Sequence, residues 1–160
     1  MDAEMGKWHA LVSAEKEVAR CRAEVNELPS RAEILAEAMS GRSVWGRSTA
    51  MTFLRHFPED VPRFLELLVD LSLSIGWAQQ AWEAILPARR EIDLSRFTEI
   101  VLRHLSDGDA EDYLRLADML THVEAWEILG VVIERARESD DPEIRQVADD
   151  FTESYGGMLP

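Results

Sequence analysis

The sequence predicts an all-α protein of about nine helices, arranged as antiparallel helix pairs that stack into a short α-solenoid. Three observations predict this class. Apolar residues recur at three- and four-residue intervals along most of the 160 residues, which places them on one face of a helix. No stretch alternates apolar and polar residues with the β-branched enrichment that is typical of strands. A helix–turn–helix unit recurs loosely over residues 30–153, with a period of about 33 residues.

Residues 4–28 are expected to form one long helix that ends at Pro29, because proline cannot continue it. Its exposed side is rich in Glu, Lys and Arg. We expect residues 1–29 to cap one end of the stack, to dock on a partner, or to pair with a second copy of the chain. The apolar stripe of this helix is interrupted by Glu15 and otherwise consists of Trp8, Leu11, Val12, Val18, Ala19, Val25 and Leu28.

Two helices are predicted between residues 30 and 57. Ser30 and Glu33 have the spacing of a capping box, and the short helix that follows ends at Gly41. Ser43 stands where the N-cap of the next helix belongs. That helix ends before Pro58.

The middle of the chain contains three further predicted helices. Asp60 is the expected N-cap of the first, and Pro62 fits its first turn. Its apolar surface is so wide that it requires neighbours on more than one side. A second helix is expected to start near Ser74 and to close before Pro87, and Asp93 is expected to cap the third.

The last third is predicted to form three more helices. Asp109 opens the first, residues 121–124 have the form of a second capping box, and Asp141 with Pro142 starts the last. Residues 154–160 lack periodicity and are expected to form a flexible tail. We expect one domain over residues 1–160.

Small residues recur at one place in the predicted repeat. Ala50, Ala81, Ala117 and Ala148 are 31, 36 and 31 residues apart, and each follows a cap candidate by seven or eight residues. A small residue lets a neighbouring helix approach closely, as stacked helix pairs require.

Residues 141–148, Asp-Pro-Glu-Ile-Arg-Gln-Val-Ala, resemble the second-helix motif of HEAT-like repeats, in which an aspartate and an arginine precede a small core residue. Residues 45–50, Trp-Gly-Arg-Ser-Thr-Ala, share the Arg-to-Ala interval. The other two units carry Ala78 and Leu114 in place of the arginine, so the resemblance covers two units of four. It implies a helical repeat scaffold that binds other macromolecules. Some small proteins of this type are enzyme subunits, and others are DNA-lesion glycosylases. The glycosylases need a basic cleft, and this acidic chain does not fit that requirement.

The formal net charge of −14 is concentrated near the C-terminus. Residues 107–160 hold 15 acidic and 4 basic residues, a net charge of −11. Such a surface repels nucleic acid and anionic membranes and favours a cationic partner. The alternative interpretation is a solvated face with no binding role.

The motifs of known catalytic and metal sites are missing. None of the four histidines has the spacing of a zinc-protease or di-iron carboxylate site. Residues 107–118 superficially resemble a calcium loop, but Asp112 stands where the turn needs glycine and Asp118 replaces the bidentate glutamate. No glycine-rich phosphate loop, nucleophile elbow or Cys-x-x-Cys pair occurs. We therefore predict no enzymatic activity, no metal and no cofactor.

The cellular setting is predicted from the single cysteine and the absence of targeting signals. Cys21 cannot form an internal disulfide, and we expect it to be a small packed residue in a reducing, cytoplasmic compartment. No apolar run of about 18 residues predicts a membrane span, and the N-terminus lacks the features of a secretory signal.

The leading hypothesis is a non-catalytic module that binds a protein with a basic surface. One form of it is an immunity protein that inhibits a cationic toxin, such as a nuclease, by presenting carboxylates in place of phosphates. One alternative is a structural or adaptor protein that forms a homodimer through its N-terminal helix. Another is an enzyme that binds a small molecule between carboxylates and histidines from separate helices. The predicted partner-binding residues are Trp45, Asp107, Asp109, Glu111, Asp112, Asp140, Asp141, Glu143, Asp149 and Asp150.

Overall fold

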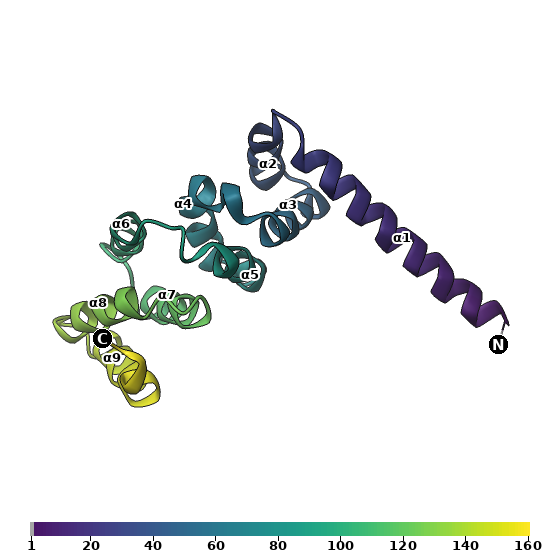
Figure 1. The fold of residues 1–160 in the computed structure, drawn as a ribbon. Coiled ribbons are helices and arrows are strands. Elements are labelled where there is room, and N and C mark those ends of the chain that lie inside the picture. The colour runs from purple at the N-terminus through teal and green to yellow at the C-terminus, as the bar shows by residue number, and fades with distance from the viewer. Residues whose placement is uncertain (1) are drawn as a thin grey trace. The chain divides into compact units, whose positions relative to one another are not determined.

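The computed structural model describes residues 2–160. Over this range it contains nine α-helices, two short 3-10 helices and no strand, which confirms the predicted all-α class (Figure 1). The α-helices are α1 Asp2–Asn26, α2 Arg31–Ser40, α3 Val44–His56, α4 Val61–Ser72, α5 Ala78–Ala88, α6 Leu94–His104, α7 Ala110–His122, α8 Trp126–Arg137 and α9 Pro142–Tyr155. The 3-10 helices are η1 Pro58–Asp60 and η2 Gly156–Met158.

Four helices begin at caps that the sequence predicts, namely Ser43, Asp93, Asp109 and Asp141. Ser43 Oγ accepts a hydrogen bond from the backbone amide three residues later, at 3.0 Å. Asp93 Oδ1 accepts from the amide three residues later at 2.7 Å, and Asp141 Oδ1 from the amide two residues later at 2.8 Å. These amides have no partner within their own helix, so each cap stabilises a helix start.

Both predicted capping boxes are wrong. The Ser30 side chain makes no capping hydrogen bond at the start of α2. Thr121 lies in the last turn of α7, where its hydroxyl donates to the carbonyl of Ala117 at 2.9 Å. The chain then reverses at Glu124, whose φ of 56° is in the left-handed region. Because of this reversal, α8 begins only at Trp126.

The helix predicted to start near Ser74 begins later and ends later. The Ser74 carbonyl accepts hydrogen bonds from the amides of Trp77 at 3.1 Å and Ala78 at 3.0 Å, so residues 74–77 form a turn before α5. The prediction that the helix closes before Pro87 is also wrong, because α5 continues to Ala88. A proline this close to the end removes only one helical hydrogen bond, which the last turn tolerates.

The chain divides into two compact units, of which the first ends at Phe53 and the second is Leu54–Pro160. Arginines join the helices of the first unit. Arg31 Nη1 donates to the carbonyl and the side-chain oxygen of Asn26, both at 2.9 Å, and so links the end of α1 to the start of α2. Arg47 on α3 donates to the carbonyls of Met39 at 2.8 Å and Gly41 at 2.9 Å, which lie at the end of α2.

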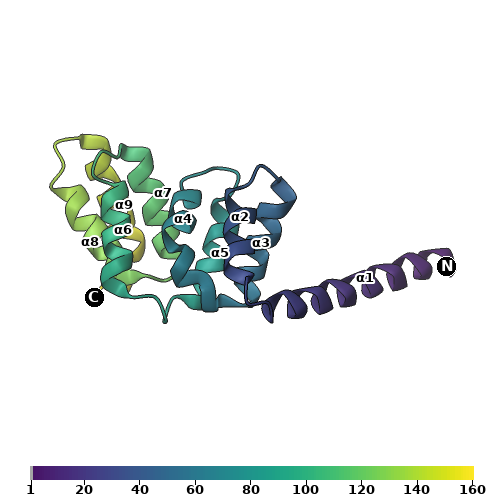
Figure 2. The same ribbon diagram turned by 90° about the horizontal axis from the view of Figure 1, so that it is seen from above.

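Helix α1 leaves most of its predicted apolar stripe exposed. Trp8 is 56% exposed and Leu11 52% exposed. Cys21 is also exposed, so the prediction of a packed cysteine is wrong. Figures 1 and 2 show the N-terminal half of α1, in purple, extending beyond α2 within the first unit. The physical reason is length, since 25 residues of helix span about 37 Å and α2 has only 10 residues.

The helices of the second unit form two rows. Figure 1 shows α4, α6 and α8 in one row and α5, α7 and α9 in the other, and neighbours within each row pack together. Contacts of α4 with α5, α7 with α8 and α8 with α9 join the rows. This sequential packing confirms the predicted stack. The core between the rows includes the fully buried side chains of Leu65, Leu68, Ile85, Val101, Leu116, Leu120, Ile128 and Leu129.

The aligned alanines occupy equivalent places in this arrangement. Ala81, Ala117 and Ala148 lie on α5, α7 and α9, which form one row, and all three are buried. Ala50 on α3 is buried as well. Small side chains therefore stand where the sequence alignment of the repeat predicts them.

The last residues of the chain have more structure than the sequence predicts for them. Residues 154 and 155 complete α9, and η2 follows. A Cβ atom added at Gly130 of α8 would lie 3.9 Å from Pro160 Cδ. Pro160 therefore lies beside α8.

Candidate partner-binding surface

Nine of the ten predicted partner-binding residues are carboxylates of the second unit. The α6–α7 and α8–α9 loops lie at the same end of this unit, because α7, α8 and α9 alternate in direction (Figure 2). All nine are exposed except Asp112, which is half-buried. Asp107, Asp109, Glu111 and Asp112 lie before or in the first turn of α7, Asp140, Asp141 and Glu143 before or in the first turn of α9, and Asp149 and Asp150 further along α9.

Three of these carboxylates cap helices. Asp109 Oδ1 accepts from the amide of Asp112 at 3.0 Å, and Asp112 Oδ2 accepts from the amide of Asp109 at 3.2 Å. This reciprocal pair is a capping box at the start of α7. Asp141 is the N-cap of α9. These carboxylates stabilise their own helices. Replacing them could lower the stability of the fold as well as the affinity for a partner, so a measured loss of binding could not be assigned to either cause.

Two further predicted residues have partners on their own helix. Glu111 forms an ion pair with Arg115 one turn along α7. Asp150 accepts a hydrogen bond from Gln146 Nε2 at 2.8 Å on α9. Both contacts are exposed and contribute little to stability.

Four predicted carboxylates remain, Asp107, Asp140, Glu143 and Asp149, which we call the late carboxylates. All four are exposed. Within residues 2–160, no hydrogen bond or ion pair of their side-chain oxygens is found. Their charges are therefore available to a partner without breaking an existing contact.

The four arginines of residues 107–160 do not neutralise the late carboxylates. Arg135 Nε donates to the Tyr113 hydroxyl at 3.2 Å, and Arg145 Nη1 to the Ser139 carbonyl at 2.6 Å. Of these four arginines, Arg115 and Arg137 pair with carboxylates of the described residues, those of Glu111 and Glu134. With Glu124, which pairs with Arg89, three of the fifteen acidic residues in this segment form ion pairs in the described part of the chain. The segment therefore keeps a strong negative potential.

The tenth predicted residue, Trp45, belongs to the first unit and lies near the start of α3. Its side chain is 84% exposed, as expected for a candidate anchor. It lines a groove together with residues of α1 and α2. The structure thus places Trp45 among apolar side chains of its own unit.

A small cavity of about 390 Å³ between α5 and α7 is a feature that sequence reasoning missed. Trp82 and His122 stack there with ring centroids 4.3 Å apart, and the buried Trp82 Nε1 makes no hydrogen bond with the described residues. Glu83 also lines the cavity and accepts hydrogen bonds from Arg55 at 2.9 Å and Gln79 at 3.1 Å. Trp82 and Glu83 are neighbours on α5, but His122 comes from α7, and no sequence motif links it to them.

The interior offers few polar groups for chemistry. Within the described residues, one polar residue, Ser72, is buried. Its hydroxyl donates to the Leu68 carbonyl at 2.8 Å. No group of three or more His, Cys, Asp or Glu residues that could hold a metal ion is found within residues 2–160.

Asp118 on α7 belongs to the calcium-like stretch of residues 107–118 and has a shifted pKa. Partial burial raises the pKa of the Asp118 carboxyl, and the nearby charge of His122 opposes this shift in part. A carboxyl whose pKa is raised by folding is easier to bury protonated than ionised. Its contribution to stability is therefore greatest at low pH and is lost as the pH rises through the raised pKa.

We expect Asp118→Asn to raise the free energy of unfolding at neutral pH, because it removes a partly buried charge. This gain should disappear below the ordinary aspartate pKa of about 3.9, where the wild-type carboxyl is protonated in both states. Urea unfolding at several pH values would measure the difference, with Asp149→Asn as an exposed control. An effect of Asp118→Asn that does not change with pH would contradict this account.

Within residues 2–160, no helix combines the length and the apolar character that crossing a membrane requires. Comparisons with protein-family models, with curated proteins and with solved structures found no match to this chain.

Proposed function

We propose that this protein is a non-catalytic binding module whose late carboxylates bind a protein with a basic surface. One form of this proposal is an immunity protein that occupies the phosphate-binding surface of a cationic toxin, such as a nuclease. The observation that carries it is the excess of exposed carboxylates without ion pairs at one end of the second unit. Such a field steers a cationic partner and accelerates its association.

The scaffold of this module is proposed to be HEAT-like. Arg145 donates to the carbonyl six residues earlier, Ser139, at the end of the preceding helix. Arg47 makes the equivalent contact with Gly41, also six residues earlier. Each arginine precedes a buried alanine by three residues. This shared contact gives the motif in these two repeats a common structural role, which supports the proposed relationship.

We further propose that the protein acts in the cytoplasm. Its single cysteine, Cys21, is exposed. An exposed thiol that forms no disulfide persists most easily in a reducing compartment.

The proposal is tested by removing the late carboxylates while keeping the helix caps. The variant Asp107→Asn/Asp140→Asn/Glu143→Gln/Asp149→Asn leaves Asp109, Asp112 and Asp141 intact. The natural candidate partner is the product of the neighbouring gene, and titration calorimetry would measure its Kd. We expect this variant to weaken binding at least about tenfold, mainly through slower association.

A matched control separates the surface from the overall charge. The control also removes four negative charges, but at exposed positions outside residues 107–160. It is the variant Glu37→Gln/Glu59→Gln/Asp70→Asn/Glu91→Gln. It should leave the Kd nearly unchanged. Equal effects of the two variants would show that net charge alone matters. Tight binding that the first variant leaves unaffected would reject the electrostatic proposal.

A further inference from the structure

Helix α1 has an apolar face that its own unit covers only in part. The C-terminal half of α1 forms one wall of an open groove of about 520 Å³, and α2 with α3 forms the rest. The same face continues along the N-terminal half, where no other helix of the first unit covers it. The apolar residues that line the groove include Val18, Val25, Ile34, Leu35, Ala38 and Trp45, and those beyond it are Met5, Trp8 and Leu11.

The face follows a seven-residue repeat. Trp8, Glu15 and Arg22 are seven residues apart, and Leu11, Val18 and Val25 stand three residues after each of them. Together these six positions form the seam that two helices bury in a coiled coil. The two charged residues in the seam are Glu15 and Arg22. Polar residues in a seam specify the register and orientation of the two helices.

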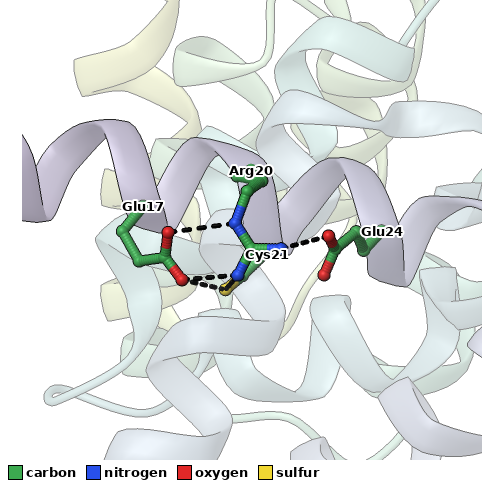
Figure 3. A network of polar contacts seen from close by, with 4 residues as sticks. All are labelled: Glu17, Arg20, Cys21 and Glu24. Atoms are coloured by element: carbon green, nitrogen blue, oxygen red, sulfur yellow. Dashed lines mark hydrogen bonds and ion pairs between the residues drawn. The ribbon is translucent and has the colours of Figure 1, made fainter.

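Charged side chains of α1 outside the seam form ion pairs within the helix. Arg20 forms ion pairs with Glu17 three residues before it and with Glu24 four residues after it, and it contacts Cys21 (Figure 3). The Arg20 guanidinium lowers the pKa of the Glu17 carboxyl. By contrast, no ion pair of Glu15 or Arg22 is found within residues 2–160. The network of Figure 3 lies outside the seam, although Glu17 and Cys21 also line the groove. Among the described residues, the two opposite charges of the seam have no ion-pair partner.

We propose that α1 pairs antiparallel with α1 of a second copy of this chain. In the register that matches the repeat, Trp8 of each copy faces Val25 of the other, Leu11 faces Arg22, and Glu15 faces Val18. Trp8 and Leu11 of one copy thereby enter the apolar groove of the other. The pairing is symmetric, so both grooves are filled and both exposed N-terminal halves are covered.

The seam charges select the antiparallel arrangement. In this register Arg22 of one copy lies one turn, about 6 Å along the axis, from Glu15 of the other. Each Arg22 can thus pair with a Glu15 across the interface. A parallel pair in register would instead place Glu15 against Glu15 and Arg22 against Arg22, which is repulsive.

The test is a charge exchange in the seam, read by sedimentation equilibrium of the full chain over a wide concentration range. Glu15→Arg alone and Arg22→Glu alone should each raise the dimer dissociation constant at least about tenfold, because each creates a pair of like charges. The double variant Glu15→Arg/Arg22→Glu inverts the ion pair and should restore a dissociation constant close to that of the wild type.

The control places the same charge changes outside the seam. Glu24→Arg and Arg20→Glu alter the network of Figure 3 at two residues that do not line the groove, and they should leave the dimer dissociation constant nearly unchanged. Circular dichroism checks that every variant remains helical.

Three results would overturn the proposal. The first is a wild-type protein that stays monomeric at every concentration. The second is a dimer that neither seam variant weakens, as expected for a parallel pair or for an interface elsewhere. The third is a double variant that remains as weak as the single ones, which would exclude the proposed register.

Discussion

Replacing Leu129 by alanine is expected to lower the free energy of unfolding by about 2–5 kcal/mol, because it leaves a cavity in the core of the second unit. Leu129 is fully buried on α8. This helix packs against α6, α7 and α9, so the loss affects both rows. Urea unfolding followed by far-UV circular dichroism would measure the change.

Leu114→Ala is the matched control for this prediction. Leu114 lies on the neighbouring helix α7 but is 44% exposed. Its replacement should change the free energy of unfolding by only about 0.5 kcal/mol. If both substitutions cost the same, the buried side of α8 would not be part of the packed core.

Replacing Ala81 by leucine should lower the free energy of unfolding by about 1–3 kcal/mol, because the added atoms overpack a filled site. Ala81 is fully buried on α5, which packs against α4 and α7. The result would test the idea that small residues let the stacked helices approach closely. Thermal or urea unfolding of the full chain is a suitable measurement.

Ala23→Leu provides the comparison, because Ala23 is exposed on α1. Leucine is nearly as good a helix former as alanine, so this change should be almost neutral. A neutral or stabilising effect of Ala81→Leu would instead show unfilled space beside α5, and the explanation of the alanine repeat would then fail.

Most of the fold could be predicted because local patterns determine it. The caps Ser43, Asp93 and Asp141 are each satisfied within three residues of sequence, and the structure confirms them. The errors in the predicted helix ends arise where contacts beyond the local sequence determine where a helix begins or ends. The reversal at Glu124 delays α8, and α5 continues through Pro87 because the proline falls in its last turn.

Burial was harder to predict than helix position. The stripe of α1 has the same periodicity as the core helices, yet Trp8 and Cys21 are exposed. Periodicity shows which residues share a face, but it does not show whether the same chain supplies a partner for that face. The length of α1 beyond α2 is the reason why the other helices of the first unit leave this face exposed.

The candidate surface was predictable in its charge but not in the role of each carboxylate. A count of residues is enough to place the net charge of −11 in residues 107–160. Only the structure separates Asp109 and Asp112, which cap α7, from the late carboxylates, which make no such contact. The cavity beside Trp82 and His122 gave no signal in the sequence because no motif links His122 on α7 to the lining residues of α5.

The proposal that the late carboxylates are the contact surface is tested most directly by a hydrogen-exchange footprint of the complex with the neighbouring gene product. We predict slower amide exchange on binding in the α6–α7 and α8–α9 loops, in the first turns of α7 and α9, and around Asp149 on α9, with little change elsewhere in the second unit. Protection confined to the first unit, or to α5 around the Trp82 cavity, would contradict it.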